Sequence, residues 1–304
     1  MDNDNALLQI ARNLYKDARF GLKYRGVPIL SAAAGNDAAA QAIRAGQPFL
    51  FGRCGATEMR TVAAYLHGGG YSDRVRQEIA ALSGVFPTDD ATLNRFCERY
   101  IRCAQSADLL ALWDVGAERE VIRGCGATRF TRLRALEPYY HAHPWSAALA
   151  GLRVLVVHPF EKTILAQYAR RERLFTNAPG GPDTLPAFAS LTVVRAVQGL
   201  AGQPTGYPDW FAALEAMQRQ MDRCTYDVAI VGAGAYGLPL AAHARDTGHV
   251  AIQMSGATQL LFGIKGRRWD SHPQISKLYN DAWVRPGADE QPRNHQAVEG
   301  GSYW

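Results

Sequence analysis

The chain has 304 residues, 47% of them hydrophobic, which is enough for one large domain or two ordinary ones, each with its own core. The net charge of +5 comes mostly from arginine and suits a protein that handles anionic ligands, but no long basic run with interleaved aromatic residues indicates a nucleic-acid partner. The five scattered cysteines lack a C-x-x-C pair, and neither a signal-peptide pattern nor an apolar run of about 18 residues is present, so we expect a cytoplasmic protein with reduced thiols and no transmembrane segment.

The first half of the chain mixes helical patterns with short apolar runs. ALLQIARNLYKDARF and DAAAQAIRAG predict two helices, the second with Asp37 near its start and Gly46 after its end, and together they form a helical N-terminal extension over about 1–47. The elements expected next are a strand over 49–53, a helix from Thr57, helices over 73–82 and 90–104, and a strand in ADLLALWD. The polar, glycine-bearing stretch 116–131 is expected to be irregular.

The second half alternates strands with helices. We expect strands over 152–157, 191–197, 228–231 and 249–254, helices over 163–174 and 208–221 and after the third strand, and an irregular tail from about 270 to 304. Nearly continuous apolar strands are typical of a parallel sheet buried on both faces. The pattern therefore predicts a single α/β domain over 1–304, Rossmann-like, with a mostly parallel sheet, helices on both faces, and ligands beyond the carboxyl ends of the strands.

A glycine turn follows the third of these strands. Gly232, Gly234 and Gly237 have the spacing G-x-G-x-x-G between an apolar run and a helical segment, where backbone N–H groups and a helix dipole can hold a phosphate. A dinucleotide site also needs an acidic residue about 20 positions further on, and Ser255, Gly256 and Ala257 follow the next apolar run instead. The glycines thus indicate either a phosphate cradle or only a tight turn with close packing.

Three longer runs resemble a known family. HPFEKTILAQYARRERLF, the stretch YDVAIVGAGAYGLPLAAHARDTGHVAIQMSGATQLLFGIKGRRWD and the run VEGGSYW resemble a GT-D-like family of bacterial proteins found with cell-surface polysaccharide genes, and the resemblance extends from about Phe49 to Trp304. That family is related to the GT-D type glycosyltransferases. The resemblance implies a Rossmann-like fold, a nucleotide-sugar donor, a divalent cation (manganese or magnesium) and transfer of a sugar to a glycan or lipid-linked precursor of the bacterial surface.

The family's D-x-E metal motif lies in an R-F-G-D-G-E setting, and the matching stretch here is RCGATE. Arg53, Gly55 and Glu58 match, whereas Ala56 stands in place of the aspartate. Magnesium can be held by one or two carboxylates together with substrate phosphates and water. The resemblance therefore implies that Glu58 is the metal ligand or the catalytic base.

Charged residues in the other turns complete the expected site. Lys265, Arg267 and Arg268 can clamp a diphosphate, although a solvated loop is the simpler interpretation. Asp114 ends an apolar run and is a candidate for catalysis or for binding ribose, metal or acceptor; a plain surface turn is its alternative. The remaining candidates for substrate or nucleotide binding are His158, Glu161, Tyr236, Gln259 and Asp270. For His158 the alternative is a structural histidine, and for Glu161 a helix cap.

Two other classes of protein stay open. An NAD-dependent oxidoreductase or sugar-nucleotide enzyme would use the glycine turn for its cofactor, and the missing ribose carboxylate argues against it. A noncatalytic member of the family would bind a nucleotide or a partner without turnover, and Ala56 favours this alternative. Association into homo-oligomers is compatible with either.

Overall fold

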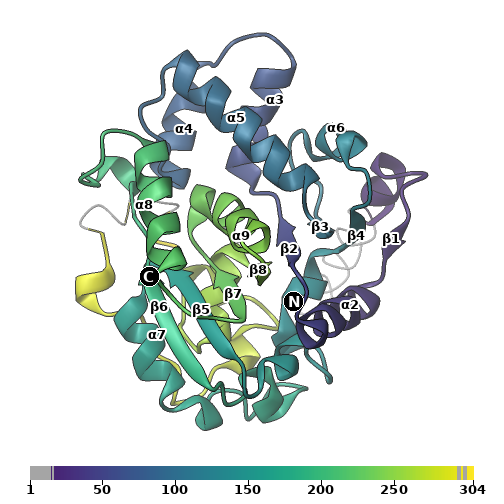
Figure 1. Cartoon of the computed structure of the whole chain (residues 1–304), viewed down its shortest axis with the longest axis vertical. Helices are drawn as coiled ribbons and strands as arrows, with labels where there is room; N and C mark the ends of the chain where they lie inside the picture. Colours follow the sequence, from purple (N-terminus) through teal and green to yellow (C-terminus); the bar gives the residue numbers. More distant parts are fainter. Residues whose placement is uncertain (1–14, 16, 293–295, 297–299) are drawn as a thin grey trace, which may run out of the picture.

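The structure is a computed structural model that describes residues 15, 17–292, 296 and 300–304. Much of the first expected helix lies outside the described residues, but residues 17–23 are helical. Over the described residues, eight strands form one parallel sheet in the order β1-β4-β3-β2-β8-β7-β5-β6 (Figure 1). The strands are β1 (Ile29–Leu30), β2 (Phe49–Arg53), β3 (Leu109–Leu112), β4 (Arg129–Arg132), β5 (Arg153–His158), β6 (Ser190–Arg195), β7 (Val228–Val231) and β8 (Val250–Gln253).

Helices cover both faces of the sheet, as expected for a Rossmann-like α/β protein. One face carries α3 (Ala56–Leu66), α4 (Asp73–Ser83), α5 (Asp90–Gln105), α8 (Trp210–Asp222) and α9 (Gly237–Asp246). The other carries α2 (Ala32–Ala45), α7 (Glu161–Tyr168), α10 (Thr258–Leu261) and several single-turn 3-10 segments. Figure 1 shows α3, α4 and α5 together at one end of the molecule, with α2 beside β1 at one edge of the sheet.

Side chains alternate in direction along each strand, so the sheet divides the hydrophobic core into two layers. In β5, Leu155 and Val157 join the cluster under α8 and α9, whereas Val154 and Val156 join the cluster on the opposite face. Successive side chains of a strand point to opposite faces, so a continuous apolar run supplies both layers. This is why the apolar runs predicted the central strands correctly.

The N-terminal region and the polar middle of the chain differ from expectation. α2 begins at Ala32, where Ser31 caps it by accepting the N–H of Ala34, and not near Asp37. The region expected as a helical extension also supplies strand β1, which pairs with β4. The stretch expected to be irregular contains α6 (Glu118–Val121) and leads directly into β4.

The sheet has a switch point between β5 and β7, because the strands that follow them in the chain lie on opposite sides of this pair. After β5 the chain passes through α7 on one face to reach β6, and after β7 it passes through α9 on the opposite face to reach β8. β5 and β7 are neighbours. A crevice forms at such a switch point beyond the carboxyl ends of the strands, and it is the usual ligand position in this class of fold.

The described part of the chain contains no helix that is long and apolar enough to cross a bilayer. From residue 270 onward the described residues form turns, single 3-10 turns, η11 (Ser276–Leu278) and η12 (Ala288–Glu290) among them, and one isolated β-bridge from Val284 to Ile264.

Candidate functional site

The turns after β2 and β7 lie on the same edge of the sheet, and Gln253 connects them. β8 lies between these two strands, and Gln253 is its last residue. The side chain of Gln253 is buried; its Oε1 accepts the N–H of Arg53 at 2.8 Å, and its amide packs directly beneath Gly237. Sequence reasoning missed this residue, which stands at the end of the strand where a dinucleotide-binding protein would carry its ribose carboxylate.

The glycine turn has both the packing role and the open backbone that the sequence left as alternatives. A Cβ on Gly232 would lie 2.5 Å from Oγ1 of Thr258 and 2.8 Å from the His158 ring, so only glycine fits there. Gly234 has a φ of +53° and is exposed. Across the described residues, the N–H groups of Ala233, Gly234 and Ala235 donate to no acceptor. Of these three residues only Gly234 is exposed, so its N–H is the one that an anion can reach without displacing other residues, whereas Ala233 and Ala235 are buried.

Glu58 lies in the first turn of α3, next to the end of β2. Its side chain is 7% exposed and folds back over Gly55, so closely that a Cβ on Gly55 would come within 1.8 Å of Glu58 Oε2. The N–H of Gly55 donates instead to the hydroxyl of Tyr100 at 2.8 Å. The partial positive charge of the helix N-terminus favours a carboxylate at this position.

A metal ion at Glu58 would have few protein ligands. Among the residues that the structure describes, no group of three or more His, Cys, Asp or Glu side chains is arranged to hold a metal ion. Glu58 can supply one carboxylate, and the other ligands would have to be substrate phosphate and water, an arrangement that magnesium accepts.

Asp114, the other expected catalytic residue, anchors the helix over 17–23. It follows β3 with a φ of +65°, and its carboxylate pairs with Arg19 at 3.0 Å and Lys23 at 2.6 Å. The buried Glu118 holds this turn in place, because its carboxylate accepts hydrogen bonds from the backbone N–H of Asp114 at 3.0 Å and from the hydroxyl of Tyr24.

Polar and aromatic side chains follow the neighbouring strands β2, β3 and β4. The Arg53 guanidinium lies 4.8 Å from the centre of the Trp113 ring, and the Trp113 indole N–H donates to the carbonyl of Cys54 at 2.8 Å. Glu137 follows β4 by one 3-10 turn, η2 (Leu133–Leu136), and its Oε1 accepts the Tyr139 hydroxyl at 3.3 Å. Arg53, Trp113 and Glu137 thus lie at the carboxyl ends of β2, β3 and β4.

Burial raises the pKa of the Glu137 carboxyl above its ordinary value. The charges of Arg134 and Arg53 and the hydrogen bond from Tyr139 oppose this shift in pKa without cancelling it. Carboxyls with such shifts concentrate at functional sites, although structural ion pairs produce them too. Sequence reasoning missed Glu137 because β4 was not predicted; the signal available was a glutamate followed by proline directly after RFTRLRAL.

His158 and Glu161 follow β5. His158 is 3% exposed, its Nδ1 accepts the N–H of Phe160 at 3.1 Å, and burial lowers its pKa to about 3. The ring is therefore neutral at physiological pH, which matches the structural interpretation. Glu161 is half-buried in the first turn of α7, where negative charge is favoured, but its side chain makes no capping hydrogen bond within the described part of the chain, so the expected cap is not formed by this residue.

The N-terminus of α7 is occupied by a carboxylate that sequence reasoning did not select. Glu290, only 2% exposed, accepts the N–H of Lys162 at 2.7 Å and bonds to both the N–H and the hydroxyl of Thr163. Asp289 pairs with the Lys162 ammonium at 2.5 Å. The tail therefore fills an anion position at the end of β5.

The expected basic loop packs against residues 300–304. The backbone N–H of Arg268 donates to the carbonyl of Ser302 at 3.0 Å, and the N–H of Arg267 to that of Trp304 at 3.3 Å. The Gln259 side chain donates to the carbonyl of Tyr303 at 3.1 Å, so its amide holds the chain in place.

Other charges of this loop also have partners within the protein. The Lys265 ammonium lies 5.2 Å from the centre of the Tyr279 ring, and Asp270 pairs with Arg285 at 2.6 Å. The Arg268 guanidinium lies 5.0 Å from the centre of the Tyr303 ring, which itself lies against Gly256 just after β8, and the Arg267 guanidinium donates to the carbonyl of Gly300 at 3.4 Å. The loop thus lies next to the end of β8, and the side chains of Arg267 and Arg268 are exposed to solvent.

Tyr236, expected to bind nucleotide, belongs to the core beneath the glycine turn. Its ring stacks on Trp210 with centroids 4.9 Å apart and an interplanar angle of 7°. Both side chains are buried, and neither the Tyr236 hydroxyl nor the Trp210 indole N–H has a hydrogen-bond partner within the described part of the chain.

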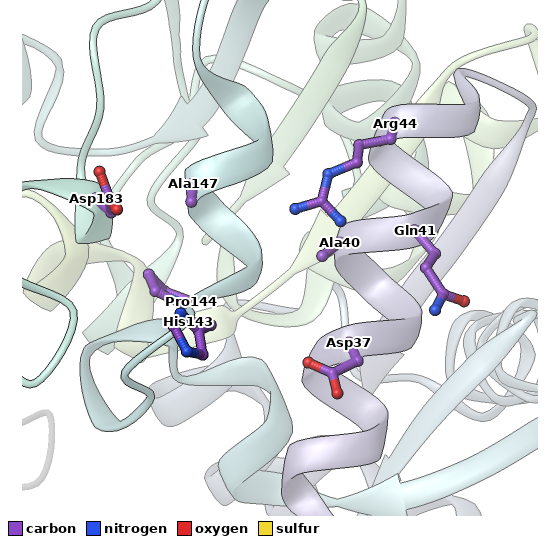
Figure 2. A pocket seen from close by; sticks show the side chains of 8 residues that line it. All are labelled: Asp37, Ala40, Gln41, Arg44, His143, Pro144, Ala147 and Asp183. Carbon is purple, nitrogen blue, oxygen red and sulfur yellow. The ribbon is translucent and has the colours of Figure 1, made fainter.

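One cavity lies away from this edge. It has a volume of about 430 Å³ between α2 and residues 143–147 (Figure 2). It is lined by Asp37, Ala40, Gln41, Arg44, His143, Pro144, Ala147 and Asp183. In Figure 2, Arg44 and Asp37 point from α2 toward the opposite wall. No residue expected at the functional site lines it, and its charged side chains are exposed, so it does not enlarge the site at the carboxyl edge.

Comparison with protein-family models, with curated proteins and with solved structures finds no match. The class of protein is defined by its fold alone: a Rossmann-like α/β protein with one parallel sheet, in which a glycine turn follows β7 and polar side chains follow β2, β3 and β4.

Proposed function

We propose that the protein is a cytoplasmic glycosyltransferase of the GT-D-like kind, which moves a sugar from a nucleotide-sugar to a glycan or lipid-linked precursor of the bacterial surface. The proposal rests on the resemblance of RCGATE, GAGAYG and GATQLLFGIKGRRWD to that family. It also rests on the position of the turns RCGATE and GAGAYG at the same edge of the sheet. Manganese or magnesium at Glu58 is part of the proposal.

The observation that carries the proposal is the pairing of two helix N-termini across β8. The turn before α9 presents the exposed N–H of Gly234, the end of β2 carries Arg53 and the first turn of α3 carries Glu58, with Gln253 fixing one turn to the other. Sugar transfer needs stabilisation of the negative charge that develops on the leaving diphosphate. Free N–H groups, a guanidinium and a carboxylate-bound cation are suited to that task.

A noncatalytic nucleotide- or partner-binding protein is the second candidate. Two observations favour it: Ala56 removes one carboxylate of the family's metal motif, and Asp114 is paired with Arg19 and Lys23. Neither feature alters the glycine turn that is proposed to bind an anion, but each leaves one carboxylate fewer for catalysis. An NAD enzyme has less support, because Gln253 ends β8 and uses its side chain on Arg53.

Thermal-shift measurements against nucleotides, nucleotide-sugars and NAD, each with and without manganese, test the proposal. A ligand that binds the native state raises the melting temperature by mass action. We expect one nucleotide-sugar to stabilise the protein, more strongly with manganese, and Glu58→Gln to lose the manganese-dependent part. Glu215→Gln, a change on the exposed surface of α8, serves as the control and should respond like the wild type.

Each alternative outcome has a distinct meaning. Stabilisation by a nucleotide-sugar without release of nucleoside diphosphate would favour the noncatalytic candidate. Stabilisation by NAD alone would contradict the proposal and indicate an oxidoreductase. A response that Glu58→Gln leaves unchanged would remove the metal from the proposal.

A further inference from the structure

Arg53 is an arginine without an ion pair at the carboxyl edge of the sheet. It is the last residue of β2 and is half-buried, and among the described residues no carboxylate oxygen lies within 4.0 Å of its guanidinium nitrogens. Its Nη1 donates to the carbonyl of Cys54 at 3.3 Å, whereas Nε and Nη2 donate to no acceptor in the described part of the chain. These two N–H groups lie on one side of the guanidinium and can bind an anion in parallel.

Trp113 holds this guanidinium in place. The guanidinium carbon of Arg53 lies 4.8 Å from the centre of the Trp113 ring, which is close enough for a cation–π contact. The indole N–H of Trp113 donates to the carbonyl of Cys54 at 2.8 Å, so the same oxygen accepts from both side chains. Cys54 directly precedes Gly55, over which the Glu58 carboxylate folds. Direct contacts therefore join Arg53 and Trp113 to the turn that carries Glu58.

The backbone of Trp113 is held by a buried carboxylate. Oε2 of Glu118, which is fully buried, accepts the N–H of Trp113 at 3.1 Å and the hydroxyl of Tyr24. The same turn packs against α3, where the N–H of Ala117 donates to the carbonyl of Met59 at 3.4 Å. The ring beside Arg53 therefore belongs to a turn that contacts hold from two sides.

We propose that Trp113 is a positioning residue for Arg53, whose Nε–H and Nη2–H groups bind the diphosphate of the ligand; the choice of a diphosphate rests on the proposed function. Because the unliganded protein already holds the guanidinium, binding does not have to order a long side chain. An aromatic ring fixes the cation without neutralising it, as a carboxylate would. The backbone N–H of Arg53 bonds to Gln253, whose amide packs beneath Gly237, so the same edge includes the glycine turn.

Binding of inorganic pyrophosphate, measured by isothermal titration calorimetry without added metal, tests this assignment. Pyrophosphate carries the diphosphate group alone, so the test does not require the donor sugar to be known. Arg53→Gln should weaken binding at least about 10-fold, because hydrogen bonds to a charged group are lost. Trp113→Leu should weaken binding about 3-fold to 10-fold, the range expected when binding has to order one long side chain. Trp113→Phe keeps a ring beside Arg53 and should recover part of this loss.

A double variant separates positioning from a general effect on folding. If Trp113 acts through Arg53, Trp113→Leu should cause no further loss of pyrophosphate binding in the Arg53→Gln background. Tyr168→Leu is the matched control, because it removes a ring 5.4 Å from the Arg171 guanidinium at the last residue of α7, the end of this helix away from the carboxyl edge. The Tyr168 hydroxyl accepts the N–H of Phe188, so the control should lower the melting temperature and leave pyrophosphate binding unchanged.

The outcomes distinguish this assignment from the proposed function. Wild-type affinity of Trp113→Leu, or additive losses in the double variant, would overturn the positioning role of Trp113. Wild-type affinity of Arg53→Gln, or no binding of pyrophosphate to the wild type, would overturn the whole assignment. The expected pyrophosphate results together with failure of every nucleotide-sugar to stabilise the wild type would remove the proposed sugar transfer and leave this assignment standing.

Discussion

At the scale of single residues, position decides what a carboxylate can do. Glu58 lies on a helix N-terminus, Asp114 pairs with two cations, Glu290 caps a helix from a distant segment, and Glu137 is half-buried beside arginines without an ion pair. These carboxylates have similar intrinsic chemistry, and their surroundings alone decide which partners each one binds.

Gly55→Ala tests the close contact between Gly55 and Glu58. The backbone of Gly55 has φ −85° and ψ 147°, which alanine adopts freely, so the added Cβ acts only by displacing the Glu58 carboxylate. We expect a loss of stability of about 1–3 kcal/mol, typical of overpacking, together with loss of the manganese-dependent thermal shift. Urea denaturation and the nucleotide-sugar screen measure the two effects.

The control and the double variant make this test specific. Gly69→Ala adds a methyl group where no atom lies within 4 Å and should change neither property. In the Glu58→Ala background, Gly55→Ala should cost much less stability, since the contacting carboxylate is gone. An equal cost in both backgrounds would show that the contact with Glu58 is not its cause.

At the scale of secondary structure elements, helix termini explain much of the edge. α2 and α8 are capped by a local Ser31 and Asp209, and sequence patterns can find such caps. α7 is capped by Glu290, which is more than 120 residues away in the chain. No local pattern could connect them, because their contact depends on the return of the tail to the end of β5.

Glu290→Ala should destabilise the protein by about 1–3 kcal/mol, because the N–H groups of Lys162 and Thr163 would lose their buried acceptor. Asp289→Ala is the matched control: its carboxylate is an exposed partner of Lys162, and exposed ion pairs contribute little. Equilibrium urea denaturation of both variants measures the difference. Equal effects of the two changes would contradict the capping role of Glu290.

The missed elements have a shared physical reason. β4 has the sequence RFTR, in which Arg129 is exposed and Thr131 alone is buried, and β1 consists of only two residues. Both lie at one edge of the sheet, where fewer residues are covered and apolar patterning is weak. Glu137 follows β4 by one 3-10 turn, so missing the strand also hid this half-buried carboxylate.

At the scale of the whole molecule, one sheet joins both core layers. Each central strand contributes side chains to both layers, as Leu155 and Val156 do in β5, so neither layer can lose its packing without the other. We therefore expect a single unfolding transition, in which tryptophan fluorescence and far-UV circular dichroism change at the same urea concentration. Two separate transitions would show that the chain folds as more than one unit.

The sequence by itself determined the class of fold, because apolar runs of four to six residues between amphipathic segments can be buried only in a parallel sheet covered by helices. It also placed Glu58 and the glycine turn after strands, and parallel strands bring such turns to one edge. Only the tertiary structure decided which charges remain available there. The pairing of Asp114 with Arg19, the capping of α7 by Glu290 and the bond from the Arg53 N–H to Gln253 join segments distant in the chain. Electrostatic environment depends on distance in space, which local sequence patterns do not contain.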